Sequence, residues 1–178
     1  VCTTGQLHWA VNEVNTRGGD RVTVEDYLNH FSSPFQKILE RYNDNIKLVI
    51  DASNGVGGLQ MSNLLTKLDD FNCSIVNMDG ILNLECGADY VKVNQQPPTL
   101  PTSLDKENTV FCSFDGDADR IVFFYFDNGK FRLLDGDRIA ILIARFFKEH
   151  LPDRFTIGVV QTAYANGNCT NYVKELGL

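Results

Sequence analysis

Residues 109–126 read TVFCSFDGDADRIVFFYF, two apolar runs on either side of a short acidic turn. The runs 109–114 and 121–126 have the length and the aromatic and β-branched content of buried strands. Because only a short turn separates them, we expect an antiparallel pair. Asn128-Gly129 then gives a strong hairpin signal, which predicts a further strand over residues 130–134.

The segments on both sides of this pair predict an α/β fold. Upstream, a strand at 46–50 leads through DASNGVGG (51–58) into a helix that carries Leu59, Leu64, Leu65 and Leu68, and a strand at 73–78 follows. Such a β-α-β unit favours parallel strands with a right-handed crossover. Downstream we expect an apolar helix over 138–150, a strand over 155–161 and a short helix over 168–176. The sum is a mixed β-sheet packed between helices.

The remaining segments indicate how the chain is divided. Helices are expected at 5–15 and 23–41, with Thr4 and Thr23 as N-caps, and residues 79–108 are expected to form a long irregular connection. The first helix stands alone, and the last strand and helix have nothing left to pack on. We therefore expect one complete domain, roughly residues 20–150, cut from a longer protein with pieces of its neighbours.

Composition excludes several classes of partner. The 178 residues carry a formal net charge of -7, with 16 basic and 23 acidic side chains, and the basic ones are scattered along the chain. A nucleic acid partner is therefore not expected. Since no window approaches the ~18 apolar residues of a membrane span, no membrane partner is expected either. Five cysteines without a C-x-x-C pair indicate a reducing compartment, so the expected location is cytoplasmic.

The acidic turn is the strongest candidate for a functional site. Asp115, Asp117 and Asp119 alternate along it, and their carboxylates repel one another unless a cation lies between them. Oxygen ligands favour Mg²⁺ or Ca²⁺. With Arg120 beside the metal, the loop could hold a phosphate.

Other interpretations of this turn remain. One is a solvated hairpin turn, and another is a phosphatase of the haloacid dehalogenase type with Asp115 as nucleophile and Asp117 as acid. An EF-hand is excluded, because its sixth position is Arg120 and its twelfth is Phe126. Two glycine-containing motifs give weaker evidence of a functional site. Residues 54–58 fail the G-x-G-x-x-G spacing, because Gln60 stands where the last glycine belongs, and they predict a turn with close packing. Residues 135–137 predict a turn and a helix cap.

Residues 114–120 resemble the metal-binding loop of the α-D-phosphohexomutases. Four further segments agree, in the family's order and over nearly the whole chain: DASNGVGG (51–58), CGADYVK (86–92) with QPP (96–98), LDGD (134–137) and VVQTAYANG (159–167). The second and last are more particular to the branch that acts on N-acetylglucosamine phosphates. By this resemblance residues 1–16 end the family's first domain, 17–152 form its second, metal-binding domain, and 153–178 begin its third.

The resemblance implies a specific reaction. In such enzymes a phosphoserine of the first domain gives its phosphate to N-acetylglucosamine 6-phosphate, and the bisphosphate reorients and returns a phosphate, which leaves the 1-phosphate for UDP-N-acetylglucosamine synthesis in the cytosol. Mg²⁺ bridges the phosphoserine and the loop, which implies that Asp115, Asp117 and Asp119 are its ligands. Arg120 is then a catalytic partner of the transferring phosphoryl group.

Several motifs of the family are not in this sequence. They are the Ser-His-Asn-Pro type segment around the phosphoserine, the sugar-recognition loop of the third domain and the Arg-x-Ser-Gly-Thr phosphate loop of the fourth, and Gly5 replaces the usual proline of T-T-P-Q-L-H. We therefore expect this chain alone to bind the metal weakly and to turn over no substrate. The alternatives are a mutase for another hexose phosphate and a non-catalytic Mg²⁺ or phosphate-binding module.

Overall fold

The computed structural model describes residues 2–18, 21–42 and 46–178. The chain divides into two compact units, residues 1–133 and 134–178, which are described separately. The boundary expected after residue 152 between the second and third domains falls inside the second unit.

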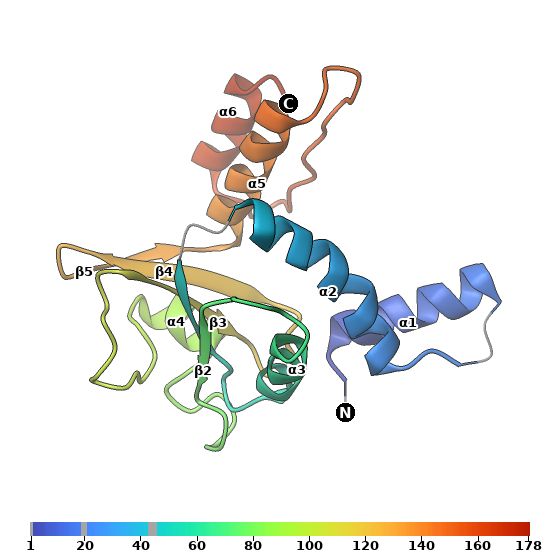
Figure 1. The fold of residues 1–178 in the computed structure, drawn as a ribbon. Coiled ribbons are helices and arrows are strands. Elements are labelled where there is room, and N and C mark those ends of the chain that lie inside the picture. Colours follow the sequence, from blue (N-terminus) through green and yellow to red (C-terminus); the bar gives the residue numbers. More distant parts are fainter. Residues whose placement is uncertain (1, 19–20, 43–45) are drawn as a thin grey trace. The chain divides into compact units, whose positions relative to one another are not determined.

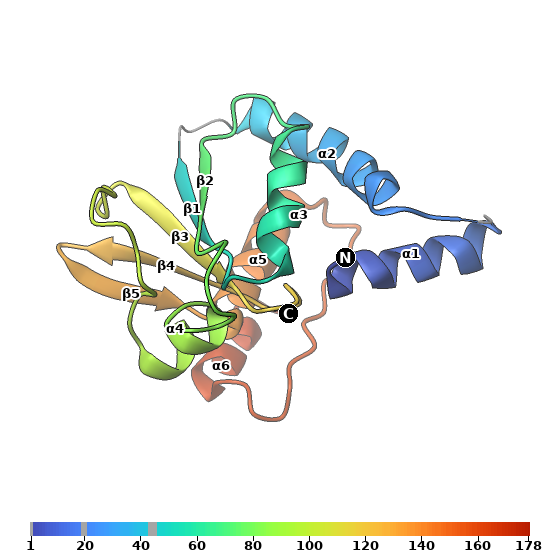
Figure 2. The same ribbon diagram turned by 90° about the horizontal axis from the view of Figure 1, so that it is seen from below.

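A five-stranded mixed sheet organises the first unit (Figure 1), and its strands lie in the order β2-β1-β3-β4-β5 (Figure 2). Its strands are β1 (Lys47–Asp51), β2 (Cys73–Val76), β3 (Thr109–Phe114), β4 (Ile121–Asp127) and β5 (Lys130–Leu134). β1 pairs in parallel with both β2 and β3, whereas β3 and β4 are antiparallel. The predicted β-α-β unit, the antiparallel pair and the mixed α/β sheet are thus confirmed.

The sheet carries its main hydrophobic core on one face. Because side chains alternate along a strand, Val49, Phe111 and Phe124 point to the same side. There they are fully buried and pack with Ala88 and Val91 of α4 (Ala88–Asn94). The Phe111 and Phe124 rings stack with centroids 5.0 Å apart. α4 is therefore held to the sheet by the two apolar side chains of its buried face.

The other face of the sheet is covered by helix α3 (Val56–Leu65) (Figure 2). Phe114 points to this face, and a Cβ built on Gly57 of α3 would lie 2.8 Å from its ring. α3 in turn contacts α2 (Val24–Arg41). The sheet therefore lies between helices, as expected, and the turn after Phe114 emerges beside the start of α3.

Two N-terminal helices begin at side-chain caps. Thr23 caps α2 as predicted, with a capping box closed by Asp26. α1 (Thr4–Arg17) is capped by Thr3 and not by Thr4, because the Thr3 hydroxyl accepts from Gln6 N–H while the Gln6 side chain accepts from Thr3 N–H. This one-residue difference places Thr4 in the first turn of the helix.

The expected irregular connection over 79–108 contains α4, so that prediction was wrong. α4 has only seven residues, and its N-cap Gly87 makes no side-chain cap hydrogen bond. Two helical turns are too short to show a hydrophobic period in the sequence. The strand and helix around 51–78 also end earlier than expected: Asn77 takes a left-handed φ of 54°, which ends β2, and Leu68 lies beyond α3.

The second unit contains helices α5 (Gly136–His150) and α6 (Gly167–Glu175). Asp135 caps α5 through a hydrogen bond from Arg138 N–H, as predicted. The expectation that the last helix has nothing to pack on was wrong, because α6 contacts α5 and Arg145 Nη1 donates to the Tyr172 hydroxyl at 3.4 Å.

The strand expected over 155–161 was also wrong, since the structure shows irregular backbone there. A strand requires a neighbouring strand for its N–H and C=O groups. Among the described residues 135–178 there is none.

Within the described ranges, every helix is too short or too polar to cross a bilayer.

Candidate metal centre

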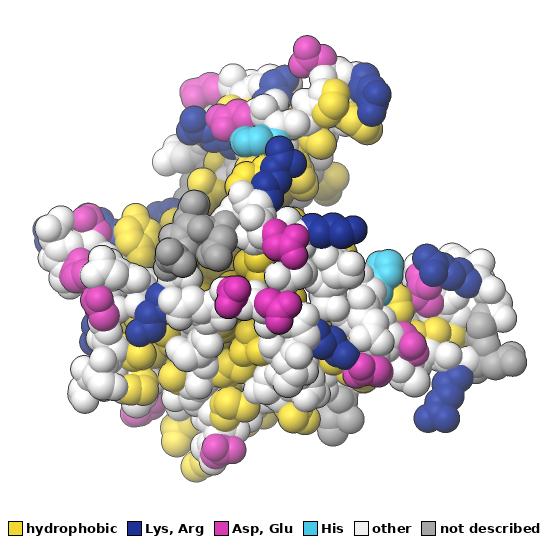
Figure 3. Space-filling model, viewed as in Figure 1, with side chains coloured by type: hydrophobic (Ala, Val, Ile, Leu, Met, Phe, Trp, Pro, Cys, Tyr) yellow, Lys and Arg dark blue, Asp and Glu magenta, His cyan; other side chains and the backbone are white. Residues whose placement is uncertain are grey.

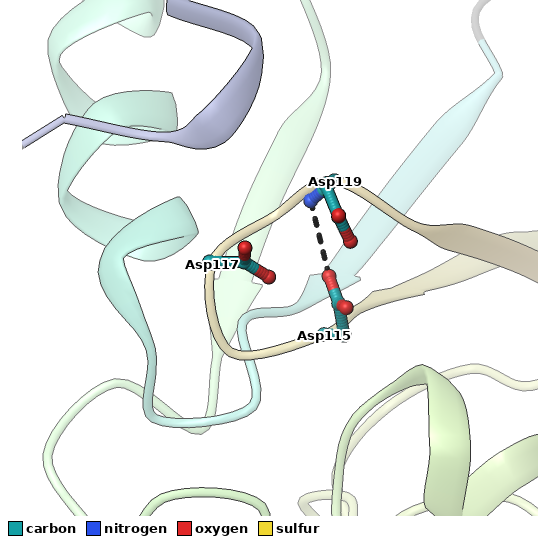
Figure 4. Close-up of side chains that lie close together, drawn as sticks. All are labelled: Asp115, Asp117 and Asp119. Atoms are coloured by element: carbon teal, nitrogen blue, oxygen red, sulfur yellow. Dashed lines mark hydrogen bonds between the residues drawn. The ribbon is translucent and has the colours of Figure 1, made fainter. Parts of the chain in front are cut away.

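The turn between β3 and β4 brings three alternate carboxylates together. We call residues 115–120 the acidic loop. One oxygen each from Asp115, Asp117 and Asp119 lie within 4.8 Å of one another (Figure 4). The loop curls because Ala118 takes a left-handed φ of 55° and its N–H donates to the Asp115 carbonyl at 3.2 Å. The alternating aspartates of the sequence thus form a cluster of three carboxylates.

Asp115 is the anchored member of the cluster. It is buried, and its Oδ1 accepts the N–H groups of Asp119 and Arg120, both at 3.1 Å, while the Arg120 Nε donates to its Oδ2 at 2.7 Å. Burial alone would favour the neutral acid, but these hydrogen bonds and the guanidinium charge outweigh it and hold the pKa of Asp115 below its ordinary value. Asp115 is therefore an ionised carboxylate in a fixed position.

The other two carboxylates, Asp117 and Asp119, are exposed. The pKa of Asp119 lies above its ordinary value. The largest cause is side-chain hydrogen bonding with Asp115, followed by burial and by repulsion from the Asp115 and Asp117 charges. Such a shift is the electrostatic signature of carboxylates placed together without enough positive charge. A hard divalent cation would supply that charge, so the chemistry of the donor set fits Mg²⁺.

Arg120 lies against the cluster in a fixed orientation. Its Nη1 and Nη2 donate to the two carboxylate oxygens of Asp89, the second at 2.9 Å, in addition to the bond from Nε to Asp115. The hydrogen bond to Asp89, more than the one to Asp115, raises the pKa of the guanidinium further above its ordinary value. Hydrogen bonds to described carboxylates thus use three of its five N–H groups.

The glycine-containing segment at residues 54–58 packs against the acidic loop. A Cβ on Gly55 would lie 2.4 Å from the Gly116 carbonyl oxygen, and Val56 N–H donates to that oxygen at 3.1 Å. A Cβ on Gly57 would lie 3.0 Å from the Ala118 Cβ. Close packing, as predicted for this segment, is therefore what the glycines provide.

A buried carboxylate, Asp51, organises the base of the site. It is 1% exposed at the end of β1 and accepts four hydrogen bonds. The donors are Ser53 N–H, the Asn77 amide, Gly87 N–H and the Ser113 hydroxyl, at 3.1, 2.9, 2.7 and 2.7 Å. Asp51 thereby ties the start of α4, and with it Asp89, to the strand that leads into the acidic loop.

The structure brings together the three aspartates and Arg120 that the sequence singled out, and it adds residues that hold them which the sequence analysis did not name. Asp89 lies in the quoted CGADYVK segment and in the first turn of α4, which is the one signal that could have found it. Thr4 donates to Asp117 from 113 positions away, and the sequence gives no signal for that contact. Residues 135–137 belong to the second unit, where Asp135 caps α5 and Asp137 accepts from Asn166 N–H at 3.0 Å.

The charges on the visible surface are mixed. In Figure 3, Lys and Arg side chains are interspersed with Asp and Glu over the described residues of this face and do not gather into one basic patch. Within the acidic loop itself, the positive charge is that of Arg120, which is paired with Asp89 and Asp115.

Comparison with known proteins identifies relatives over both units. The family profile "Phosphoacetylglucosamine mutase AMG1, domain II" matches residues 19–122, and "domain III" of the same family matches residues 135–178. Phosphoacetylglucosamine mutase of Saccharomyces cerevisiae is 43% identical over 97% of this chain, and that of Homo sapiens is 40% identical over 99%. The alignments cover 35% and 34% of those proteins, so the chain spans about a third of their length.

Solved structures agree with this result. N-acetylphosphoglucosamine mutase of Aspergillus fumigatus, crystallised with GlcNAc-6P and magnesium, superposes with a TM-score of 0.84 at 39% identity, over 99% of this chain and 39% of that one. An N-acetylglucosamine-phosphate mutase of the α-D-phosphohexomutase superfamily, in its apo form, gives 0.86 at 38% identity, over 100% of this chain and 41% of that one. Sequence, fold and the order of motifs coincide, and the chain belongs to the phosphoacetylglucosamine mutase family.

Proposed function

We propose that the acidic loop binds Mg²⁺ through Asp115, Asp117 and Asp119, and that the chain supplies this centre to a phosphoacetylglucosamine mutase. That enzyme would interconvert N-acetylglucosamine 6-phosphate and the 1-phosphate through a phosphoserine and a bisphosphate. The observation that carries the proposal is the convergence of three carboxylates within 4.8 Å in a chain whose fold matches a mutase crystallised with GlcNAc-6P and magnesium.

Each residue of the loop has a distinct part in this proposal. A bound divalent cation would supply positive charge next to a phosphoryl group. Asp115 is held ionised by its hydrogen bonds, which makes it the rigid ligand, while Asp117 and Asp119 close the cluster from the exposed side. Asp89 fixes the plane of the Arg120 guanidinium. The N–H groups that remain on Nη1 and Nη2 are then oriented to donate to a phosphoryl oxygen.

The local charge explains why the loop needs the rest of an enzyme. Asp89 and the three loop aspartates carry four negative charges against the single positive charge of Arg120. A divalent cation leaves the group with one negative charge. A sugar phosphate dianion is therefore not held by this loop alone. We expect the isolated chain to bind Mg²⁺ weakly and to turn over no substrate.

The cellular role follows from the same proposal. The product would feed UDP-N-acetylglucosamine synthesis in the cytoplasm, and the phosphoserine that meets the metal would come from the family's first domain. All five cysteines are free thiols in the structure, which supports a reducing compartment.

A metal titration tests the proposed centre. MgCl₂ is added to the ¹⁵N-labelled chain and the amide signals of the acidic loop are followed by NMR, for the parent and for Asp117→Ala. Asp127→Ala is the matched control, since Asp127 is an exposed carboxylate at the end of β4, outside the acidic loop. We expect saturable shifts in the parent and the control, and their loss in Asp117→Ala with an unchanged melting temperature.

Unchanged Mg²⁺ binding by Asp117→Ala would contradict the proposed centre and favour the interpretation of the loop as a solvated hairpin turn. A coupled assay for N-acetylglucosamine 1-phosphate tests the enzymatic part. Turnover by the purified 178-residue chain would contradict the expectation that this chain needs further domains.

A further inference from the structure

The N-terminus of α1 meets the acidic loop directly. The Thr4 hydroxyl donates to Asp117 Oδ2 at 2.7 Å, and Thr4 N–H donates to the Asp117 carbonyl at 3.3 Å. One residue thus binds both the side chain and the backbone of the central aspartate of the cluster. The contact joins the first helix of the chain to a turn 113 residues later.

Thr4 is held in place by bonds that do not involve the acidic loop. The capping box of Thr3 and Gln6 fixes the first turn of α1. The Gln6 side chain is buried, and its Nε2 donates to Gln60 Oε1 of α3 at 3.0 Å. α1 is therefore anchored on α3, and Thr4 presents its hydroxyl from a fixed support.

Asp117 has no comparable restraint of its own. Asp115 accepts three hydrogen bonds from the loop, whereas the side-chain hydrogen bond recorded for Asp117 among the described residues is the one from Thr4. Packing does not replace this hydrogen bond, because the Asp117 side chain is exposed.

We propose that Thr4 is a positioning residue for Asp117: its hydroxyl occupies Oδ2 and holds the carboxylate so that Oδ1 is presented to the cation. Thr4 acts through Asp117 and does not itself touch the metal. This inference rests on the proposed function, since it assigns a role within the Mg²⁺ centre. It makes the affinity of the loop depend on a helix that lies outside the matched domain II segment, residues 19–122.

The test compares Thr4→Val and Thr4→Ser in the 178-residue chain. Valine keeps the size and branching of threonine but cannot donate, while serine keeps the hydroxyl. Thr16→Val is the matched control, because the Thr16 hydroxyl bonds only to the Asn12 carbonyl among the described residues of the same helix. The Mg²⁺ dissociation constant is measured by the amide NMR titration, and the melting temperature of each variant is recorded.

We expect Thr4→Val to raise the Mg²⁺ dissociation constant about tenfold, the lower end of what loss of a ligand-orienting hydrogen bond costs. Thr4→Ser should lie within about twofold of the parent, as should Thr16→Val. If Thr4→Val unfolds the chain, the Mg²⁺ affinities of Thr4→Ala and Thr4→Ser are compared instead. Equal affinities of these two variants would refute the positioning role.

The outcomes separate this inference from the proposed function. If the parent binds Mg²⁺, Asp117→Ala does not, and Thr4→Val binds as the parent does, Thr4 is not a positioning residue and the metal centre stands. If the parent itself shows no saturable Mg²⁺ binding, both the centre and the role of Thr4 are refuted.

Discussion

The packing of Gly55 against the acidic loop gives a sharp test of the site. Gly55 is the N-cap of α3 with φ -105° and ψ -172°, an extended conformation that alanine also adopts. Gly55→Ala is therefore not strained by its backbone. Its methyl group would, however, lie 2.4 Å from the Gly116 carbonyl oxygen and 2.9 Å from the Gly116 Cα. The substitution is thus a purely steric change aimed at the loop.

The structure sets the size of the expected effect. The Gly116 carbonyl has to move by more than half an ångström before the methyl group reaches even 3.0 Å, the lower limit of real contacts. Overpacking of this kind costs about 1 to 3 kcal/mol. For a chain of this length that corresponds to a melting temperature lower by roughly 3 to 10 °C. Because Gly116 lies between Asp115 and Asp117, the same movement separates two carboxylates of the cluster.

Thermal unfolding followed by circular dichroism and the Mg²⁺ titration measure the two effects. Gly5→Ala is the control, because its Cβ would meet only the Thr3 hydroxyl at 4.0 Å and the residue lies in helix α1, where alanine is favoured by about 0.5–1 kcal/mol. We expect Gly55→Ala to melt earlier and to bind Mg²⁺ at least tenfold more weakly. A Gly55→Ala chain with the stability and affinity of the parent would show that this close packing does not shape the loop.

Two further predictions concern the buried carboxylate Asp51 and the cysteine thiols. Asp51 accepts four hydrogen bonds, and Asp51→Asn would place an NH₂ group opposite some of their donors. We therefore expect the free energy of unfolding, measured by urea denaturation, to fall by about 1–3 kcal/mol. An unchanged denaturation midpoint would contradict this expectation. Burial raises the pKa of Cys73 and of Cys86 to about 11, so about one part in a thousand of each is thiolate at pH 8. A disulfide exchange reagent at pH 8 should then label exposed Cys2 rapidly, partly exposed Cys73 slowly, and buried Cys86, Cys112 and Cys169 only after unfolding. Fast labelling of all five thiols in the folded chain would refute this order of reactivity.

Local signals in the sequence account for most of the fold. The two apolar runs around DGDADR became β3 and β4, the Asn-Gly turn became the β4–β5 hairpin, and Thr23 and Asp135 became helix caps. Each of these features depends on residues within a few positions of one another. Periodicity, turn chemistry and capping therefore suffice to predict them.

The errors occurred where tertiary contacts decide the local structure. α4 forms because Ala88 and Val91 are buried against the sheet and Gly87 N–H donates to Asp51, a residue 36 positions away. The expected strand at 155–161 failed for the converse reason, since its apolar alternation finds no strand to pair with among the described residues 135–178. Neither outcome is written in the local sequence.

The same division runs through the candidate site. The sequence by itself located the cluster of carboxylates. Three aspartates alternate within one short turn between two buried strands, so their side chains are near enough along the chain to converge. Only the tertiary structure decided how they are held. Asp89 is 31 residues from Arg120, and Thr4 is 113 from Asp117. The order of the strands and the anchoring of α1 on α3 place these partners at the loop, and such contacts depend on the closure of the whole unit, which no local pattern encodes.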